Sequence, residues 1–298
     1  MELVDRRRAL MMAAAALLAG CAERRSQAAT VTAEEFAAIE VKGSGRLGVC
    51  GIDSATGTRF GWRKDEHFAH CSSFKLSLAA MVLRGARLGS WRLDERLRWS
   101  QADLLPNSPV SGAHLADGLT LAELARGALV ASDNTAANLL LHRLGGPQAM
   151  TAFWRETGDE VSRLDDFEPA LNVVFPGSEA NTTTPAAMAA TVARLVAGDV
   201  LDPLDRVALL SWMAEVQTGS RRLRAGFPQG WLSGDKTGTG IDPRSTTYVD
   251  LAYGGPPGRP PLIVAVYFVP NVLTGGIDPA AEAILADVGR LAARTVGA

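Results

Sequence analysis

The order in which strand-like and helix-like segments follow one another constrains the fold of this chain most. Strand-like segments on either side of the turn 53–57 predict a hairpin over 46–53 and 58–64 near the start, and the strand pattern returns over 246–253 and 262–269 near the end. Apolar residues spaced three and four apart predict helices between them. These helices begin at 73 and continue at 119–129, 134–144, 150–157, 185–197 and 203–215. Strands from both ends can pair in one sheet, so the order predicts an α/β fold of the α+β type: an antiparallel sheet covered by terminal helices, with an all-α region inserted.

The domain boundaries follow from this order. We expect a discontinuous α/β domain of residues 31–64 and 216–298, interrupted by an all-α domain of residues 65–215. Thr32 and Glu35 have the spacing of a capping box and predict a helix over 34–40, and an amphipathic helix is expected over 279–295. The stretch 163–181 carries few helix or strand signals. Loops of that length inside a compact domain are usually functional or disordered.

The first residues are typical of an export signal. Three arginines precede the apolar run 9–19, which is too short to cross a bilayer as a helix. The run ends at Cys21 in a sequence that resembles a bacterial lipobox, and an ordinary secretory signal with an incidental cysteine is the alternative. Either reading makes residues 1–21 a signal and 22–30 a tether, and places the protein in the periplasm or outside the inner membrane. A lipid on Cys21 would be its membrane contact.

The serine and lysine of an S-x-x-K motif are the first candidate catalytic residues. Ser72 and Lys75 stand three residues apart at the expected start of a helix, so they share one face. The lysine amine can then accept the hydroxyl proton, and helix N–H groups favour developing negative charge. The structural alternative is a helix cap followed by a surface lysine.

Two further motifs follow in the chain. Ser132, Asp133 and Asn134 come directly before a helix, where they could simply cap it or could relay a proton and hold a substrate amide. The segment from Lys236 to Gly238 reads K-T-G at the end of an expected strand. It could be a plain strand edge, or it could present a cation and the Thr237 hydroxyl to a carboxylate while the small glycine lets the backbone approach closely.

A fourth motif lies in the long loop. Glu168 and Asn172 form E-x-x-L-N just after Arg163. A carboxylate with an amide four residues on can hold a water and take its proton, as hydrolysis of an ester requires. Alone, it would be an ordinary glutamate in a proline-containing loop.

Together these motifs resemble those of the class A serine β-lactamases. S-x-x-K, S-D-N and K-T-G are shared by that family and the penicillin-binding proteins, and E-x-x-L-N resembles the omega loop of the β-lactamases. The resemblance implies a five-stranded antiparallel sheet beside an all-α domain, with the active site at their interface. It implies hydrolysis of the β-lactam amide of penicillins and cephalosporins.

The resemblance also implies roles for individual residues. Ser72 is the expected nucleophile and Lys75 its proton acceptor, while Ser132 passes a proton to the leaving nitrogen. Glu168 and Asn172 are expected to position the deacylating water.

Substrate binding is expected from a second group. The resemblance implies that Asn134 orients the substrate amide and that Lys236, Thr237 and Thr239 receive the substrate carboxylate. Arg222 matches a position from which family members add a second cation. The backbone N–H groups of Ser72 and Thr239 would form the oxyanion hole, and such donors each lower a barrier by about 3 kcal/mol.

Three features depart from the family pattern. Asn107 stands where many members carry an aromatic residue. Cys71 matches a half-cystine of the disulfide-bearing carbapenemases, but Gly240 stands at the partner position. Asp166 and Asn181 occupy the places of an Arg–Asp pair that often braces the omega loop, so that salt bridge cannot form.

Other readings are weaker. Cys50 and Cys71 are expected to be buried free thiols, and His67 and His70 lack further ligands at a spacing that suits zinc. We expect no metal or cofactor, no nucleic-acid partner given a formal net charge of −2 without a basic stripe, and a monomer. The alternative functions are a DD-peptidase of the penicillin-binding type, a β-lactam sensor that acylates without turnover, and an S-x-x-K esterase, which resembles families with Tyr-x-Asn instead of Ser-Asp-Asn. The sequence leaves the range of β-lactams open.

Overall fold

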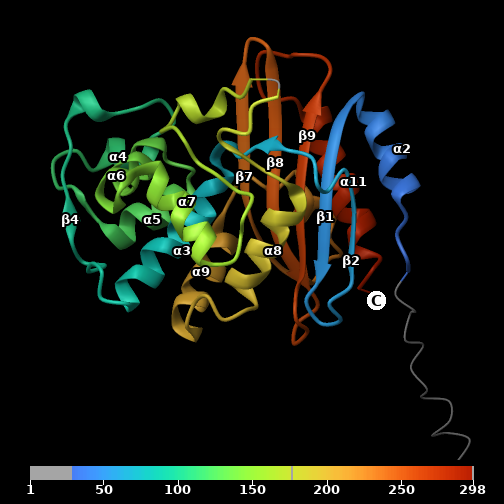
Figure 1. Ribbon diagram of the computed structural model, residues 1–298, viewed down its shortest axis with the longest axis horizontal. Coiled ribbons are helices and arrows are strands. Elements are labelled where there is room, and N and C mark those ends of the chain that lie inside the picture. The colour runs from blue at the N-terminus through green and yellow to red at the C-terminus, as the bar shows by residue number, and fades with distance from the viewer. Residues whose placement is uncertain (1–28, 176, 297–298) are drawn as a thin grey trace, which may run out of the picture.

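A five-stranded antiparallel sheet forms the centre of the computed structural model (Figure 1), which describes residues 29–175 and 177–296. Its strands lie in the order β2-β1-β9-β8-β7. Their bounds are Gly45–Asp53 for β1, Arg59–Trp62 for β2, Leu232–Asp242 for β7, Ser245–Gly255 for β8 and Leu262–Pro270 for β9. The expected α+β fold with a sheet built from both ends of the chain is confirmed. The export signal and lipobox lie outside the described residues.

Pairing between the two ends of the chain holds the sheet together. β1 and β9 pair along their whole lengths, from Gly45 opposite Pro270 to Asp53 opposite Leu262. Both strands are mostly buried, and β9 has a continuous run of apolar residues instead of a strict alternation. Such a continuous apolar sequence is typical of a strand that is covered on both faces.

Helices cover both faces of the sheet. α2 (Ala33–Gly43) and α11 (Pro279–Ala293) pack against one face, where Phe36 and Ile284 join a buried apolar cluster with Val264. Thr32 and Glu35 cap α2 reciprocally, which confirms the capping box. The all-α region lies against the other face. Residues of the sheet and of the helical region can therefore line a site between these two parts.

The helical region surrounds α3. Its elements are α3 Phe74–Arg87, α4 Pro109–Ala113, α5 Leu121–Val130, α6 Asn134–Leu144, α7 Gly146–Glu156, α8 Pro185–Val196 and α9 Pro203–Glu215. The short α10 Leu223–Gly226 packs against α11 on the other face of the sheet. α3 is buried over most of its length, and its apolar side chains share one cluster with residues of the sheet such as Val249 and Tyr267. The division into two domains remains a prediction, because the helical region and the sheet share this core.

Several expected boundaries were wrong by a few residues. The helix expected from 119 begins at Leu121, because Leu119–Thr120 forms strand β5, paired with β4 (Arg96–Leu97), and Thr120 then caps the helix. The helix expected from 150 already begins at Gly146. Within the long loop, a 3₁₀ turn forms at Ala170–Asn172.

The long loop is closed at its base by backbone pairing. Strand β3 (Phe68–Ala69) pairs with β6 (Thr182–Thr183), and Arg163 N donates to Thr182 O at 3.1 Å. Across the part of the chain that the structure describes, every helix is too short or too polar to cross a membrane.

Candidate active site

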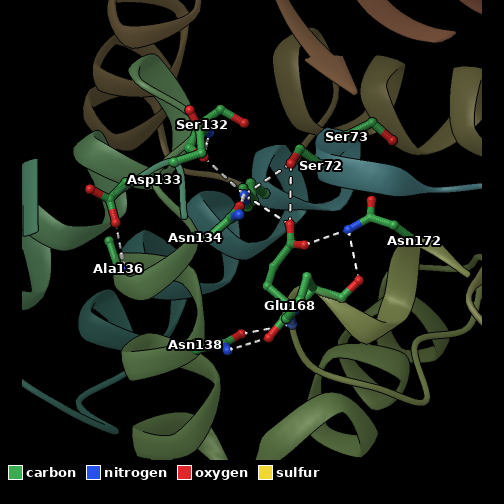
Figure 2. Close-up of polar contacts among 12 residues, drawn as sticks. Ser72, Ser73, Ser132, Asp133, Asn134, Ala136, Asn138, Glu168 and Asn172 are labelled. Carbon is green, nitrogen blue, oxygen red and sulfur yellow. Dashed lines mark hydrogen bonds and ion pairs between the residues drawn. The ribbon is translucent and has the colours of Figure 1, made fainter. Parts of the chain in front are cut away.

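Ser72 lies in a 3₁₀ turn, Cys71–Ser73, that leads directly into α3. Lys75 follows in the first turn of α3 with its side chain fully buried, and its Nζ is 2.9 Å from Ser72 Oγ. The shared face expected from the S-x-x-K spacing is therefore present (Figure 2). The lysine is in the interior and not on the surface.

The amine of Lys75 is surrounded by oxygen atoms from two other segments. It lies 3.0 Å from Ser132 O and 2.5 Å from Asn134 Oδ1 in the S-D-N segment, and 2.9 Å from Glu168 Oε1 in the long loop. Burial lowers the pKa of Lys75, and the neighbouring Glu168 carboxylate offsets part of this effect. Low dielectric surroundings disfavour the charged form of an amine, so the lysine is poised to exchange a proton with these neighbours.

The S-D-N segment divides into a structural residue and two residues that face the site. Asp133 caps α6: its carboxylate accepts the Ala136 N–H at 2.8 Å and also the N–H groups of Val110 and Ser111. For Asp133, the structural alternative given in the sequence analysis, a helix cap, is therefore the one that the structure shows. On either side of it, the Ser132 carbonyl and the Asn134 side-chain oxygen accept from Lys75 Nζ.

A second buried lysine stands on the other side of Ser132. Lys236 Nζ donates to Ser132 Oγ at 3.1 Å and to Thr237 O at 2.6 Å. Burial and, to a smaller extent, the nearby charge of Lys75 lower the pKa of Lys236 to about 7. Ser132 thus connects the two lysines, its carbonyl to one and its hydroxyl to the other.

Glu168 reaches the site from the long loop. Its Oε1 accepts from Ser72 Oγ at 3.2 Å, and its Oε2 accepts from Asn172 Nδ2 at 2.7 Å. The structure therefore brings the E-x-x-L-N carboxylate to the S-x-x-K pair from a separate segment (Figure 2). The peptide bond between Glu168 and Pro169 is cis.

Sequence reasoning missed Asn138, which holds Glu168 in place. Asn138 Oδ1 accepts the Glu168 N–H at 3.0 Å, and Asn138 Nδ2 donates to Glu168 O at 2.9 Å. The available signal was its spacing: Asn138 is four residues after Asn134, on the same face of α6.

The K-T-G segment lies on β7 at the rim of the site. Thr237 and Thr239 point to the same face because side chains alternate along a strand, and Thr237 Oγ1 is 2.6 Å from Thr218 Oγ1. A Cβ added to Gly238 would lie 3.0 Å from both His70 O and Ser73 N. The glycine therefore allows β7 to approach the turn that carries Ser72.

Arg222 lies beneath Thr239, with its side chain only 2% exposed. Its guanidinium donates to Thr239 Oγ1 at 2.7 Å and to Gly238 O at 2.9 Å. Glu282, from the first turn of α11, accepts from Arg222 Nε at 3.2 Å and forms an ion pair with Arg221. Sequence reasoning also missed Glu282, because no local pattern connects it to Arg222, which lies sixty positions earlier in the chain.

These groups surround a cavity of about 560 Å³ between the sheet and the helical region. The residues predicted from sequence that line it are Ser72, Ser132, Asn134, Glu168, Asn172, Arg222, Thr237 and Thr239. The two lysines and Gly238 lie just behind this surface. All the predicted residues thus come together at one site.

The departures from the family pattern have local consequences. Asn107 lines the cavity at the position where many members of the family carry an aromatic residue. Cys50 and Cys71 are buried free thiols, as expected, and burial raises the pKa of Cys71 to about 12. Hydrogen bonds replace the missing omega-loop salt bridge: Asn181 Nδ2 donates to Asp166 Oδ2 at 2.8 Å, and Asn181 Oδ1 accepts the Asp166 N–H at 3.0 Å.

The remaining histidine near the site is not arranged as a ligand. His70 is fully buried and stacks on Trp154 with ring centroids 4.7 Å apart. Over residues 29–175 and 177–296, the His, Cys, Asp and Glu side chains form no group of three or more that could hold a metal ion.

Comparison with known proteins gives one family. The model of the β-lactamase enzyme family matches residues 31–296. The chain is 44% identical over 275 residues to β-lactamase L2 of Stenotrophomonas maltophilia, covering 91% of this chain and 88% of that protein. It is 41% identical over 265 residues to β-lactamase CTX-M-8 of Citrobacter amalonaticus, covering 89% and 90%.

Solved structures agree with this assignment. A reconstructed ancestral class A β-lactamase superposes with a TM-score of 0.81 at 49% identity, covering 87% of this chain and 97% of that one. The putative class A β-lactamase PenP of Rhodopseudomonas palustris gives 0.81 at 44% identity, with 87% and 97% covered. With the family's motifs gathered around one cavity, the chain belongs to the class A serine β-lactamases, hydrolases that act on the cyclic amide of β-lactams.

Proposed function

We propose that this β-lactamase opens penicillins and cephalosporins through an acyl-enzyme on Ser72, and that a water activated by Glu168 hydrolyses it. The observation that carries the proposal is the position of Glu168, whose carboxylate lies within hydrogen-bond distance of both Ser72 and Asn172. A general base must lie within such reach of the proton that it takes.

Acylation begins at the Ser72 hydroxyl. Its Oγ attacks the lactam carbonyl while its proton passes to Lys75 or Glu168, both of which contact Oγ. The backbone N–H groups of Ser72 and Thr239 are the proposed oxyanion hole. The carbonyl–nitrogen bond then breaks, and the nitrogen receives a proton from Ser132 Oγ, which takes a proton in turn from Lys236 Nζ at 3.1 Å.

Deacylation uses a different set of atoms. A water gives one proton to Glu168 while its oxygen attacks the ester, the bond to Ser72 Oγ breaks, and the serine regains a proton. Asn172 supports this step because its Oδ1 is buried and accepts no hydrogen bond from the described protein atoms. Buried acceptors are rarely left without a partner, and this one can accept from a water beside Glu168.

Charge and hydrogen-bonding groups for the substrate carboxylate lie at the other end of the cavity. Lys236, Thr237 and Thr239 supply a cation and two hydroxyls, and Arg222 adds a second cation behind Thr239. Asn134 is the proposed partner of the substrate side-chain amide. Its own amide contacts Lys75 Nζ and Pro106 O, which fixes its orientation.

The rival functions lack a use for Glu168. A DD-peptidase or a β-lactam sensor would form the same acyl-enzyme with a β-lactam and keep it, because neither has a carboxylate that activates a water against this ester. The proposal further includes export of a monomer to the periplasm or cell surface, with a lipid on Cys21 as the possible anchor.

The decisive experiment compares the purified parent protein with Glu168→Gln, using a chromogenic cephalosporin and intact mass. We expect the parent to turn over steadily and Glu168→Gln to give a burst followed by turnover about 10²–10⁴-fold slower. The adduct should accumulate on Ser72, and Ser72→Ala should give neither product nor adduct. Steady turnover by Glu168→Gln at the parent rate, with no adduct, would overturn the assignment of the base.

A further inference from the structure

The side chain of Asn107 contacts the backbone of a proposed catalytic residue. Asn107 Nδ2 lies 3.0 Å from Ser132 O. A carbonyl oxygen only accepts hydrogen bonds, so the facing amide atom must be the donor nitrogen. The Asn107 side chain therefore turns toward Ser132 at the edge of the cavity that both residues line.

The same carbonyl also accepts from Lys75. Lys75 Nζ donates to Ser132 O at 3.0 Å, so the amide and the amine together can use both lone pairs of this oxygen. Ser132 Oγ meanwhile contacts Lys236. The carbonyl of the proton-relay serine is thus fixed from two sides while its hydroxyl faces the second lysine.

Both residues have an unusual backbone. Asn107 has φ 58° and Ser132 has φ 56°, in the left-handed region that asparagine tolerates better than most other side chains. The Ser132 backbone is held in this conformation by its surroundings. The side chain of Asn107 is one of the groups that holds it.

Neighbouring hydrogen bonds join the two segments into one unit. Asn134 N donates to Asn107 O at 3.1 Å, and Asn134 Nδ2 donates to Pro106 O at 2.9 Å. These bonds use the backbone of the 106–107 segment and do not depend on the Asn107 side chain. A change confined to that side chain therefore tests the contact with Ser132 separately.

We propose that Asn107 is a positioning residue that orients Ser132 for proton delivery to the leaving nitrogen. A tyrosine side chain at this position would have no N–H group to donate to the Ser132 carbonyl. The proposal rests on the proposed role of Ser132. It assigns Asn107 to acylation alone, because Glu168 and Asn172 serve deacylation from the opposite loop.

The test uses two variants that remove the donor and one that restores it. Asn107→Gly removes the amide and still adopts a positive φ, and Asn107→Asp keeps the size while replacing the donor by an acceptor. Asn107→His offers a ring N–H at nearly the position of Nδ2. Stopped-flow rates of acyl-enzyme formation and decay should be measured for each with a penicillin, together with the melting temperature.

We expect acylation to fall about tenfold in Asn107→Gly, as for the loss of one hydrogen bond, and further in Asn107→Asp because its carboxylate repels the Ser132 carbonyl. Deacylation should stay within about twofold of the parent, and Asn107→His should recover most of the acylation rate. An unchanged acylation rate, an equal fall of both rates, or no recovery in Asn107→His would each overturn the proposal.

The parent protein distinguishes this failure from a failure of the proposed function. If the parent forms no adduct on Ser72, the proposed function is wrong whatever the variants do. If the parent acylates and turns over while Asn107→Gly acylates normally, only the role of Asn107 is wrong.

Discussion

Asn138 and Glu168 are joined by two hydrogen bonds, one in each direction, between the side chain of the first and the backbone of the second. Their contact links α6 to the long loop, thirty residues further along the chain. The loop is therefore fixed at the residue whose carboxylate contacts Ser72, in addition to the hydrogen bond between Asn181 and Asp166, which joins residues on either side of Glu168.

Asn138→Leu should lower activity by releasing Glu168. Leucine has a similar volume and neither donor nor acceptor, so two hydrogen bonds are lost, at a cost of about 1 kcal/mol each in stability. We expect deacylation to slow more than acylation, as measured by the fraction of acyl-enzyme at steady state. Asn138→Asp keeps the acceptor for the Glu168 N–H and should lie between the parent and Asn138→Leu; equal steady-state acyl-enzyme in all three would show that the contact is dispensable.

Arg222→Ala should raise the KM for anionic penicillins while Ser72 still forms an adduct. The side chain is buried and bonded to Thr239 and Gly238, so its loss removes a cation and loosens the rim of β7. Arg244→Ala is the matched control, because Arg244 pairs with Asp242 and lines a different cavity. A KM that rises in Arg244→Ala but stays constant in Arg222→Ala would show that Arg244, and not Arg222, supplies the second cation.

The binding of anionic substrates should weaken as pH rises through about 7. Burial lowers the pKa of Lys236 to about 7, so the free enzyme loses this positive charge above that pH and keeps it below. kcat/KM for a penicillin should therefore fall between about pH 6 and 8. In Lys236→Arg the guanidinium stays charged, and this decline should disappear, whatever the absolute rate; a decline of the same shape in both proteins would assign it to another group.

His70 should make the fold sensitive to acid. Burial lowers its pKa from 6.5 to about 4, so the unfolded chain binds a proton below about pH 6.5 while the folded protein does not. The stability that this provides is complete above pH 6.5 and is lost as pH falls toward 4, with a total of about 3 kcal/mol.

His70→Phe keeps a ring against Trp154 and should remove this part of the pH dependence. Guanidinium unfolding of both proteins between pH 4 and 7 measures it, since the difference in free energy of unfolding should change with pH in that window only. Parallel pH profiles would show that His70 does not titrate on unfolding.

Gly240→Cys should form a disulfide with Cys71. A Cβ built at Gly240 lies 2.8 Å from Cys71 Sγ, close to the separation of about 3 Å that follows from an S–S bond of about 2.04 Å. Under oxidising conditions the variant should lose two hydrogens in intact mass and resist alkylation at Cys71 after unfolding. Cys50 should remain alkylatable in the same sample, and alkylation of all three thiols would show that the bond does not form.

The sequence predicted most of the site because its groups come in short motifs. Ser72 with Lys75, and Glu168 with Asn172, are neighbours along the chain, so spacing alone places them together. Asn138 and Glu282 were missed because their partners are distant in sequence and only the packing of α6 and α11 brings them near. The order of the strands likewise depends on pairing between β1 and β9, which alternation within each strand does not encode.

The four oxygen neighbours of Lys75 have a consequence for proton movement. An ammonium group has three protons, so at any instant one of the four contacts lacks a proton from the lysine. The three protons can therefore be distributed over the four oxygens in more than one way while the heavy atoms keep their positions. A proton can therefore shift among Ser72, Lys75 and Glu168 with little rearrangement of the surrounding atoms, and this degeneracy prepares the site for both halves of the reaction.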